Sequence, residues 1–471
     1  MINRRDFLKV AGATACASSL PGLAAVEPSQ PNILLVMFDQ QFAEAASYRM
    51  GTQYIHTPNM DRVAAKGTVY TRAYCSNPLC VPSRTSMFTG QYPTSLEVQD
   101  NSDAIELNLT LTGYPKMFPM MGKIFQSAGY ETAYFGKWHI PCATGRNDIH
   151  GFATAKMGQG AFGQKSDDVQ TAKDAAAFLK EEHKSPFLLV ASFLNPHNIA
   201  EWSRGQALPL GDIGQPPPVD ELPPLRKNHA PQKNEPDTMT MMRRSYHSAP
   251  MFPVGGYDET KWRQYQWAYY RLIEKVDAQL GVVLDALQAS GKEKETLIVM
   301  LSDHGDCQGA HGWNQKTVFY EESARVQFVI SQPGATHSGT AKRLVNTGVD
   351  LIPTLCDYAS IAKPATMPGL SVREGEHEPR QYVVASDKML EGAPLDGRKP
   401  NPTGRMVRGQ RYKYCVYSEG ERRESLVDLE NDPGEMVNLA GEPAAHKILT
   451  EHRAMLADWC RETHDAFWIP T

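Results

Sequence analysis

The sequence predicts an α/β fold, with a large, doubly wound and mostly parallel sheet sandwiched by helices. A smaller C-terminal subdomain with an antiparallel sheet and a helix is expected to follow. Two observations carry this prediction. Continuous apolar runs alternate with a strong helical pattern in the first part of the chain, as in sheets buried on both faces. From about residue 376 the pattern changes to short alternating strands. We therefore expect a main α/β domain over residues 31–375 and a subdomain over residues 376–471.

The first 24 residues are expected to be an export signal that does not belong to the fold. Residues 3–9 read NRRDFLK, which is similar to the twin-arginine export signal, and a weakly apolar stretch and a small-x-small site at residues 22–24 follow. The stretch is too short and too rich in small residues to span a bilayer, and no other segment of the sequence is suited to do so. We predict a bacterial protein without a transmembrane segment, exported by the twin-arginine machinery to the periplasm or beyond.

Three apolar runs are predicted to be buried strands, at residues 31–39, 187–193 and 296–303. The first run ends in Asp39 and the last in Asp303. In doubly wound sheets, functional groups gather at the carboxyl ends of the strands. The two acids are therefore expected to lie at the same edge of the sheet.

A helical pattern precedes the third run and ends at Gly291. Its apolar face carries Leu272, Val276, Leu280, Val283 or Leu284, and Leu287. Residues 198–255 break the rhythm, because they are dense in Pro, Asn, Arg and Met and have little periodicity. We expect a long, loop-rich insertion there, which either roofs a substrate pocket near the active site or is a plain surface insertion. In the C-terminal part, strands are expected around residues 406–417 and a closing helix over residues 444–462.

The net charge of −5 and the pI near 6.3 argue against a nucleic-acid partner. They are compatible with an anionic substrate, because a few basic residues at one site can bind an anion in a protein of negative net charge. Six cysteines besides Cys80 follow the predicted signal, and an oxidising compartment would allow them to pair, in a connectivity that the sequence does not specify.

Residues 80–90 read CVPSRTSMFTG, and this run resembles the maturation motif of the type I sulfatases. These enzymes belong to the alkaline phosphatase superfamily. The resemblance implies that the formylglycine-generating enzyme oxidises Cys80 to formylglycine before the chain folds. It also implies a hydrated aldehyde with two hydroxyls, one that attacks sulfur and one that is deprotonated later. The resemblance extends over residues 31–361 and, through a match at residues 426–439 (LVDLENDPGEMVNL), over residues 400–440.

The same resemblance implies one divalent metal, held by Asp39, Gln40, Cys80, Asp303 and His304. Many sulfatases carry two acids where this chain has Asp39-Gln40, so an amide carbonyl would replace one carboxylate. The Asp303-His304 pair resembles the choline sulfatase and phosphonate monoester hydrolase branch. Calcium is the family expectation. Manganese or another divalent ion is the alternative, because the histidine offers a nitrogen.

A clamp on the sulfate group is expected from two lysines. Lys137 and His139 lie in GKWH, as in the family, where the lysine contacts sulfate and the histidine holds the formylglycine hydroxyl. Lys316 matches the second family lysine. Fixed cations of this kind stabilise the charge that develops on sulfate oxygens.

Three further residues are implied by the resemblance. His197, in Asn195-Pro196-His197, would face the leaving-group oxygen and is a candidate general acid that also binds substrate. Arg84 would brace the formylglycine and the bound sulfate. Asn101 lines up with a substrate-contacting asparagine of the choline sulfatase branch.

The expected activity is hydrolysis of sulfate esters, from small molecules or oligosaccharides, with a sulfated carbohydrate favoured by export. The alternatives are a phosphonate monoester or phosphodiester hydrolase, a choline sulfatase, and a non-catalytic carbohydrate-binding protein with the fold of an enzyme. Four aromatic residues could form a sugar platform, but their helical spacing favours core packing: Tyr257, Trp262, Tyr265 and Trp267.

Overall fold

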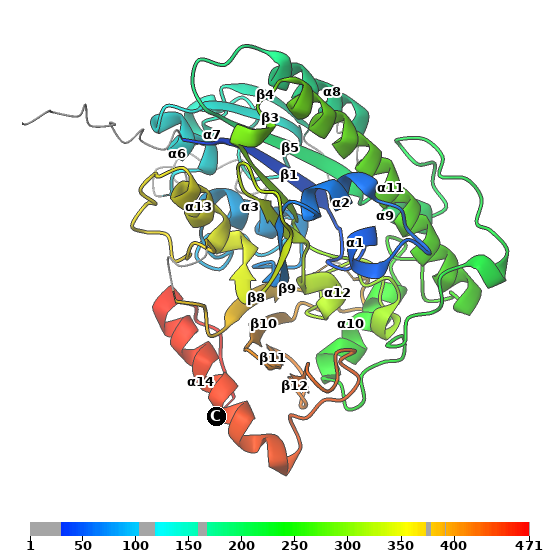
Figure 1. The fold of residues 1–471 in the computed structure, drawn as a ribbon. Coiled ribbons are helices and arrows are strands. Elements are labelled where there is room, and N and C mark those ends of the chain that lie inside the picture. The colour runs from blue at the N-terminus through cyan, green and yellow to red at the C-terminus, as the bar shows by residue number, and fades with distance from the viewer. Residues whose placement is uncertain (1–29, 103–117, 159–166, 374–377, 391, 471) are drawn as a thin grey trace, which may run out of the picture. The chain divides into compact units, whose positions relative to one another are not determined.

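The computed structural model describes residues 30–102, 118–158, 167–373, 378–390 and 392–470 (Figure 1). The predicted export signal lies outside these residues. The described residues from Pro31 onward belong to one compact unit.

The main element is an eight-stranded sheet with the order β4-β3-β5-β1-β6-β7-β2-β8 (Figure 1). Its strands are β1 (Asn32–Asp39), β2 (Thr68–Tyr74), β3 (Glu131–Lys137), β4 (Thr154–Gly158), β5 (Phe187–Pro196), β6 (Thr296–Ser302), β7 (Phe328–Ser331) and β8 (Gly339–Asn346). In this sheet of described residues, β7 pairs antiparallel with β6 and β2, and the other pairs are parallel. The predicted mostly parallel sheet is therefore confirmed.

Strand β1 shows why the sequence folds this way. Alternate residues of β1 belong to two different hydrophobic cores, with Leu34, Val36 and Phe38 in one and Ile33, Leu35 and Met37 in the other. The first core includes residues of α2 (Pro58–Ala64), α8 (Asp168–Lys180) and α11 (Glu259–Ala289). The second includes residues of α3 (Cys80–Thr89), α6 (Met121–Ser127) and α13 (Thr347–Tyr358). A strand buried on both faces must be apolar throughout, as the sequence indicated.

The predicted insertion, residues 198–255, contains more regular structure than expected. It includes α9 (Ile199–Ser203), the short 3-10 helix η1 (Val219–Glu221) and α10 (Asp237–His247). In α10, Met239, Met242 and Tyr246 are buried against Trp313 in a third core, a spacing typical of one helix face. The prediction of little periodicity was wrong for α10, because three apolar residues suffice for a helix that packs on one side only.

Other short helices connect the strands. They are α1 (Ser47–Met50), α7 (Asn147–His150), α12 (Glu321–Ala324), η2 (Glu293–Glu295) and η3 (Ala310–Gly312). Of the four aromatic residues considered for a sugar platform, Trp262, Tyr265 and Trp267 of α11 are buried in the core, and Tyr257, just before α11, is partly buried against it.

The C-terminal part forms a separate four-stranded antiparallel sheet with the order β12-β11-β10-β9. Its elements are β9 (Val383–Lys388), β10 (Thr403–Arg408), β11 (Tyr412–Tyr417), β12 (Glu424–Asp428), η4 (Pro443–Ala445) and α14 (His446–Thr463). Leu449, Leu456 and Trp459 of α14 share a core with Val407 and Tyr414 of the sheet. The predicted antiparallel sheet with a closing helix is therefore confirmed, and α14 is the red helix in Figure 1.

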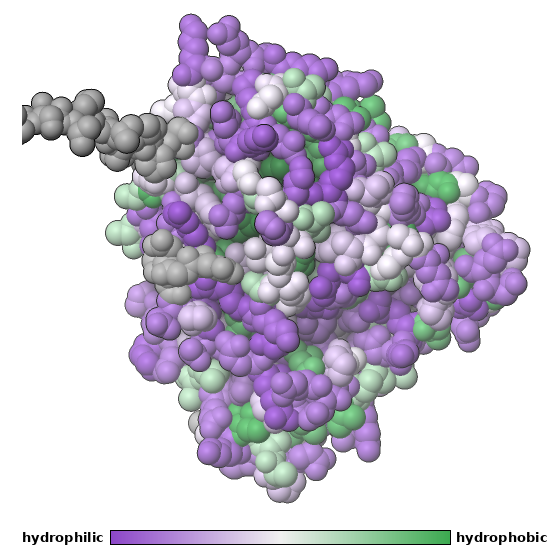
Figure 2. All heavy atoms as spheres, viewed as in Figure 1, coloured by the Kyte–Doolittle hydropathy of each residue, from purple (hydrophilic) through white to green (hydrophobic). Residues whose placement is uncertain are grey.

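Hydrophilic side chains dominate the face shown in Figure 2, with hydrophobic residues scattered in small groups. Within the described ranges, no helix is both long and apolar enough to cross a membrane. All seven cysteines in these ranges are buried and free of disulfides.

Candidate active site

Two carboxylates meet at the ends of adjacent parallel strands. Asp39 ends β1 and Asp303 follows β6, and these strands pair in a register that places Phe38 opposite Ser302. The Asp303 amide donates to the Phe38 carbonyl (3.2 Å), and the Gln40 amide donates to Asp303 Oδ1 (3.1 Å). The predicted juxtaposition at the carboxyl edge of the sheet is therefore present in the structure.

Cys80 is the first residue of α3, so its side chain lies at the positive end of the helix dipole. Its Sγ is 3.0 Å from Lys316 Nζ, 3.2 Å from His304 Nε2 and 3.8 Å from Asp39 Oδ1. Burial alone would raise the pKa of the Cys80 thiol. The nearby Lys137, Lys316 and His304 instead lower its pKa well below the ordinary value. This position therefore favours a negatively charged group.

The residues Asp39, Cys80, Asp303 and His304 form a candidate metal centre. Each offers one ligand atom, these atoms lie within 4.8 Å of one another, and all four residues are buried. His304 Nδ1 lies 3.0 Å from the carbonyl of Gly305, an arrangement in which Nδ1–H donates and Nε2 keeps its lone pair toward the cluster. Burial and the Asp39 carboxylate raise the pKa of Asp303 to about 6. A divalent cation would relieve this crowding of negative groups, so the donor set fits such an ion.

Gln40, the fifth predicted ligand, is held beside this cluster by two hydrogen bonds. Its Oε1 accepts from Lys316 Nζ at 2.9 Å, and its Nε2 donates to Asp306 Oδ2 at 2.8 Å. Asp306 Oδ2 also accepts from the hydroxyl of Tyr265 in α11, at 3.0 Å. The amide oxygen thus positions the second lysine of the predicted clamp.

Lys137 and the two predicted histidines complete the polar surroundings of Cys80. Lys137 ends β3, and its Nζ lies 2.5 Å from Asp39 Oδ2. His139 and His197 are both near enough to Cys80 for its sulfur to favour their charged forms, which partly offsets the effect of burial on their pKa values. Burial, followed by the charges of Lys316 and Lys137, lowers the pKa of His197 to about 4. Its imidazole is therefore neutral near pH 7, and an anion bound between the lysines would raise its pKa.

Arg84 ties several segments together beneath the site. Its guanidinium donates to Asp303 Oδ2 (3.2 Å) and to the carbonyls of Trp138 (2.9 Å) and Lys137 (2.5 Å). It also donates to the hydroxyls of Tyr134 (3.0 Å) and Ser192 (2.5 Å). The guanidinium is fully buried, so these contacts hold the ends of β3, β5 and β6 in place.

Asn101 lies at the start of α3, where its Oδ1 accepts from the Val81 amide at 3.2 Å. It thus caps the helix that carries Cys80. The structure brings together all the residues predicted for the site: Asp39, Gln40, Cys80, Arg84, Asn101, Lys137, His139, His197, Asp303, His304 and Lys316.

Some supporting residues were not predicted as site residues. Asp306, Tyr265, Tyr134 and Ser192 position Gln40 or Arg84. Asp168, at the start of α8, accepts the backbone amides of Leu194 and Asn195 and so holds the segment that carries His197. Only Asp306 had a local signal, because it lies in the Asp303-His304-Gly305-Asp306 run.

The chain is similar to two family models and to several known proteins. The Sulfatase family model matches residues 31–361, and the model of the N-sulphoglucosamine sulphohydrolase C-terminal region matches residues 309–462. A Delta 4,5-hexuronate-2-O-sulfatase of Bacteroides thetaiotaomicron is 33% identical, over 95% of this chain and 92% of the relative. An ulvan-active sulfatase of Formosa agariphila is 27% identical, over 94% and 83%.

The chain is also similar to solved structures. A 2-O GAG sulfatase superposes with a TM-score of 0.78 and 30% identity, over 94% of this chain and 95% of that one. A phosphonate monoester hydrolase of Agrobacterium radiobacter has a TM-score of 0.68 at 20% identity, over 92% and 96%, which is a likeness of fold.

Proposed function

The chain belongs to the sulfatase family and is a sulfuric ester hydrolase, and we propose that it removes sulfate from an anionic carbohydrate. We further propose that it does so with a formylglycine derived from Cys80 and one divalent cation, with calcium preferred over manganese. The relatives named for hexuronate and for ulvan support a carbohydrate substrate. Residues 31–375 would then be the catalytic domain and residues 376–471 its C-terminal subdomain.

The position of Cys80 is the observation that carries this proposal. Its Sγ stands where the oxygens of formylglycine would stand, 3.0 Å from Lys316 Nζ and 3.9 Å from Lys137 Nζ. A formylglycine there would supply two hydroxyls on one carbon, one to attack sulfur and one to be deprotonated later. A cation held by Asp39, Asp303 and His304 would acidify the attacking hydroxyl and polarise a sulfate oxygen.

The remaining residues act on the sulfate group and on the proton. Lys137 and Lys316 are fixed and desolvated, so they stabilise charge on sulfate oxygens without reorganising. His197, whose pKa rises when an anion binds between the lysines, donates a proton to the departing alcohol oxygen. His139, whose pKa responds to the charge of Cys80, receives the proton of the second formylglycine hydroxyl. Asn101 keeps the first turn of α3 and thus residue 80 in position, and its amide nitrogen is proposed to contact substrate.

The experiment is mass spectrometry of the peptide that contains residue 80, combined with assays of sulfate release from sulfated monosaccharides and oligosaccharides. We expect the mass of formylglycine at position 80 and turnover that is lost in Cys80→Ala. An unmodified thiol in fully active enzyme would refute the mechanism. Release from aryl sulfates alone, with none from any carbohydrate, would refute the substrate class.

A phosphonate monoester or phosphodiester hydrolase is the second candidate, because His304 Nε2 belongs to the candidate metal centre, as the Asp-His pair of that branch suggests. Phosphonate and phosphate diesters, together with choline sulfate, therefore belong in the same assay panel. A kcat/KM for a phosphate diester above that for every sulfate ester would favour this candidate.

The export of the protein and the order of its maturation are also proposals. Residues 1–24 are proposed to direct export through the twin-arginine machinery to the periplasm or beyond, after the formylglycine-generating enzyme has acted on the unfolded chain. Cys80 is 1% exposed in the folded protein, which supports modification before folding. Replacing both Arg4 and Arg5 by lysine should retain the protein in the cytoplasm, as cell fractionation would measure.

A further inference from the structure

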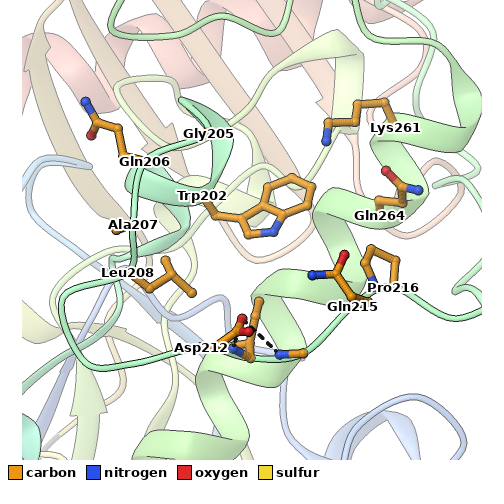
Figure 3. A pocket seen from close by; sticks show the side chains of 12 residues that line it. Trp202, Gly205, Gln206, Ala207, Leu208, Asp212, Gln215, Pro216, Lys261 and Gln264 are labelled. Carbon is orange, nitrogen blue, oxygen red and sulfur yellow. Dashed lines mark hydrogen bonds between the residues drawn. The ribbon is translucent and has the colours of Figure 1, made fainter.

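A cavity of about 590 Å³ lies between the predicted insertion and the beginning of α11 (Figure 3). Figure 3 shows the Trp202 indole between the segment that carries Gln206 and Leu208 and the side chains of Lys261 and Gln264. Its volume is within the range of small-molecule sites in proteins, about 300–1,000 Å³. Its lining combines one indole, amide side chains and one ammonium group.

The ammonium of Lys261 is the charged group best placed to bind a ligand here. It lies 4.3 Å from the ring centroid of Trp202 and 5.8 Å from that of Tyr257. Among the described residues, Lys261 forms no ion pair with a carboxylate. The one acid in the lining, Asp212, uses Oδ1 to accept the amides of Ile213 (2.7 Å) and Gly214 (3.1 Å). Lys261 therefore leaves a positive charge available at the cavity.

The walls of the cavity are fixed by contacts outside it. Lys275 Nζ donates to the carbonyls of Leu210 (2.7 Å), Gly211 (2.8 Å) and Asp212 (3.1 Å), which holds the outer loop against α11. The hydroxyl of Tyr257 donates to the Ser203 carbonyl at 3.0 Å, at the end of α9. A cavity with such walls is preformed, so a ligand would bind without the entropy cost of ordering them.

Two features link the residues that line the cavity to the active site. Along the chain, Trp202 lies in α9, which begins two residues after His197, and the Ala200 amide of this helix donates to the His197 carbonyl at 3.0 Å. Through space, Trp202 packs on Tyr265 with ring centroids 6.1 Å apart. The Tyr265 hydroxyl in turn bonds Asp306, which holds Gln40. A ligand that extends from the scissile sulfate past His197 would run along α9, which carries Trp202 to the cavity.

We propose that this cavity is a saccharide subsite that binds an anionic sugar residue next to the one that loses its sulfate. This inference rests on the proposed carbohydrate sulfatase activity. Lys261 would pair with a uronate carboxylate or a second sulfate, and the amides of Gln206, Gln215 and Gln264 would bond sugar hydroxyls. The exposed part of the Trp202 ring would pack against the apolar face of a sugar.

The test compares a 2-O-sulfated hexuronate monosaccharide with a glycosaminoglycan tetrasaccharide that ends in the same sulfated residue. Lys261→Gln is expected to raise the KM for the tetrasaccharide about tenfold or more, as for a lost hydrogen bond to a charged group, and to leave kcat/KM for the monosaccharide unchanged. Gln264→Ala should act in the same direction. The matched control is Lys294→Gln, an exposed lysine beyond the opposite end of α11, about 45 Å of helix away. Equal effects on both substrates, or no effect on either, would overturn the proposal.

A binding measurement separates this inference from the proposed function. Calorimetric titration of the Cys80→Ala protein with the same tetrasaccharide, freed of its terminal sulfate, should show binding that weakens about tenfold when Lys261→Gln is added. If the wild-type enzyme releases no sulfate from any carbohydrate while this binding is seen, the proposed function fails and the subsite stands. If the titration shows no binding, or the same affinity with and without Lys261→Gln, the proposed subsite is refuted.

Discussion

Replacing Lys316 by methionine should show how much the Lys316 ammonium contributes to catalysis, apart from its contribution to folding. Methionine has a similar length and removes only the ammonium, which lies 3.0 Å from Cys80 Sγ and 2.9 Å from Gln40 Oε1. Removing one preorganised donor that faces transition-state charge costs about 2.7–4 kcal/mol, or a factor of about 10²–10³ in kcat. Gln40 Oε1 would also lose its partner, which costs about 1–3 kcal/mol of folding free energy for a buried acceptor.

The assay is kcat and KM for sulfate release, with the unfolding of wild type and variant compared in denaturant. We expect kcat to fall by at least two orders of magnitude while the variant remains folded. Lys294→Met is the control, because it removes an exposed charge far from Cys80 and should change neither quantity. A folded Lys316→Met protein with a kcat within threefold of wild type would show that this ammonium does not stabilise the transition state.

Three further predictions follow from the site and its supports. His197→Ala should lower kcat for alkyl sulfates by about 10²–10⁴ but have little effect on nitrophenyl sulfate, whose leaving group needs no proton; equal losses on both esters would exclude a general-acid role. Burial raises the pKa of Asp168 from 3.8 to about 6. The protonated carboxyl therefore contributes its full stabilisation of the folded state below pH 4, and this contribution is lost as the pH rises through 6. The stability of wild type relative to Asp168→Asn should therefore fall by up to about 3 kcal/mol between pH 4 and pH 7, and parallel pH profiles in denaturant titrations would contradict this cause. Chelation with EDTA should abolish sulfate release and lower the midpoint of thermal unfolding. Calcium at 100 times its Kd should restore about 2.7 kcal/mol of folding free energy. An unfolding midpoint that stays the same with calcium, manganese or EDTA would argue against the metal centre.

The sheet could be predicted because its signals are local. A strand such as β1 contributes alternate residues to two cores, so its apolar run and its terminal Asp39 are visible in a short window of sequence. The antiparallel C-terminal sheet was equally visible from its alternation. The residues around Cys80 were found through motifs, each of which lies within a few positions of a strand or helix end.

What the sequence did not reveal depends on contacts between distant segments. Tyr265 was expected to pack in the core, which it does, but its hydroxyl also supports Gln40 through Asp306. The pairing of Trp202 with Lys261 joins two helices, and neither residue has a pattern that predicts the other. The helix α10 was missed because its polar residues outnumber the three buried apolar residues, Met239, Met242 and Tyr246.

The many contacts of Arg84 have an evolutionary consequence. Lysine has three donors on one nitrogen, so it could not replace a planar guanidinium that reaches two carbonyls, two hydroxyls and a carboxylate at once. A gene duplicate that lost Cys80, and with it all turnover, would still contain all five partners of this arginine, because none of them is Cys80. In such inactive descendants, selection would conserve the arginine long after the chemistry that surrounds it had disappeared.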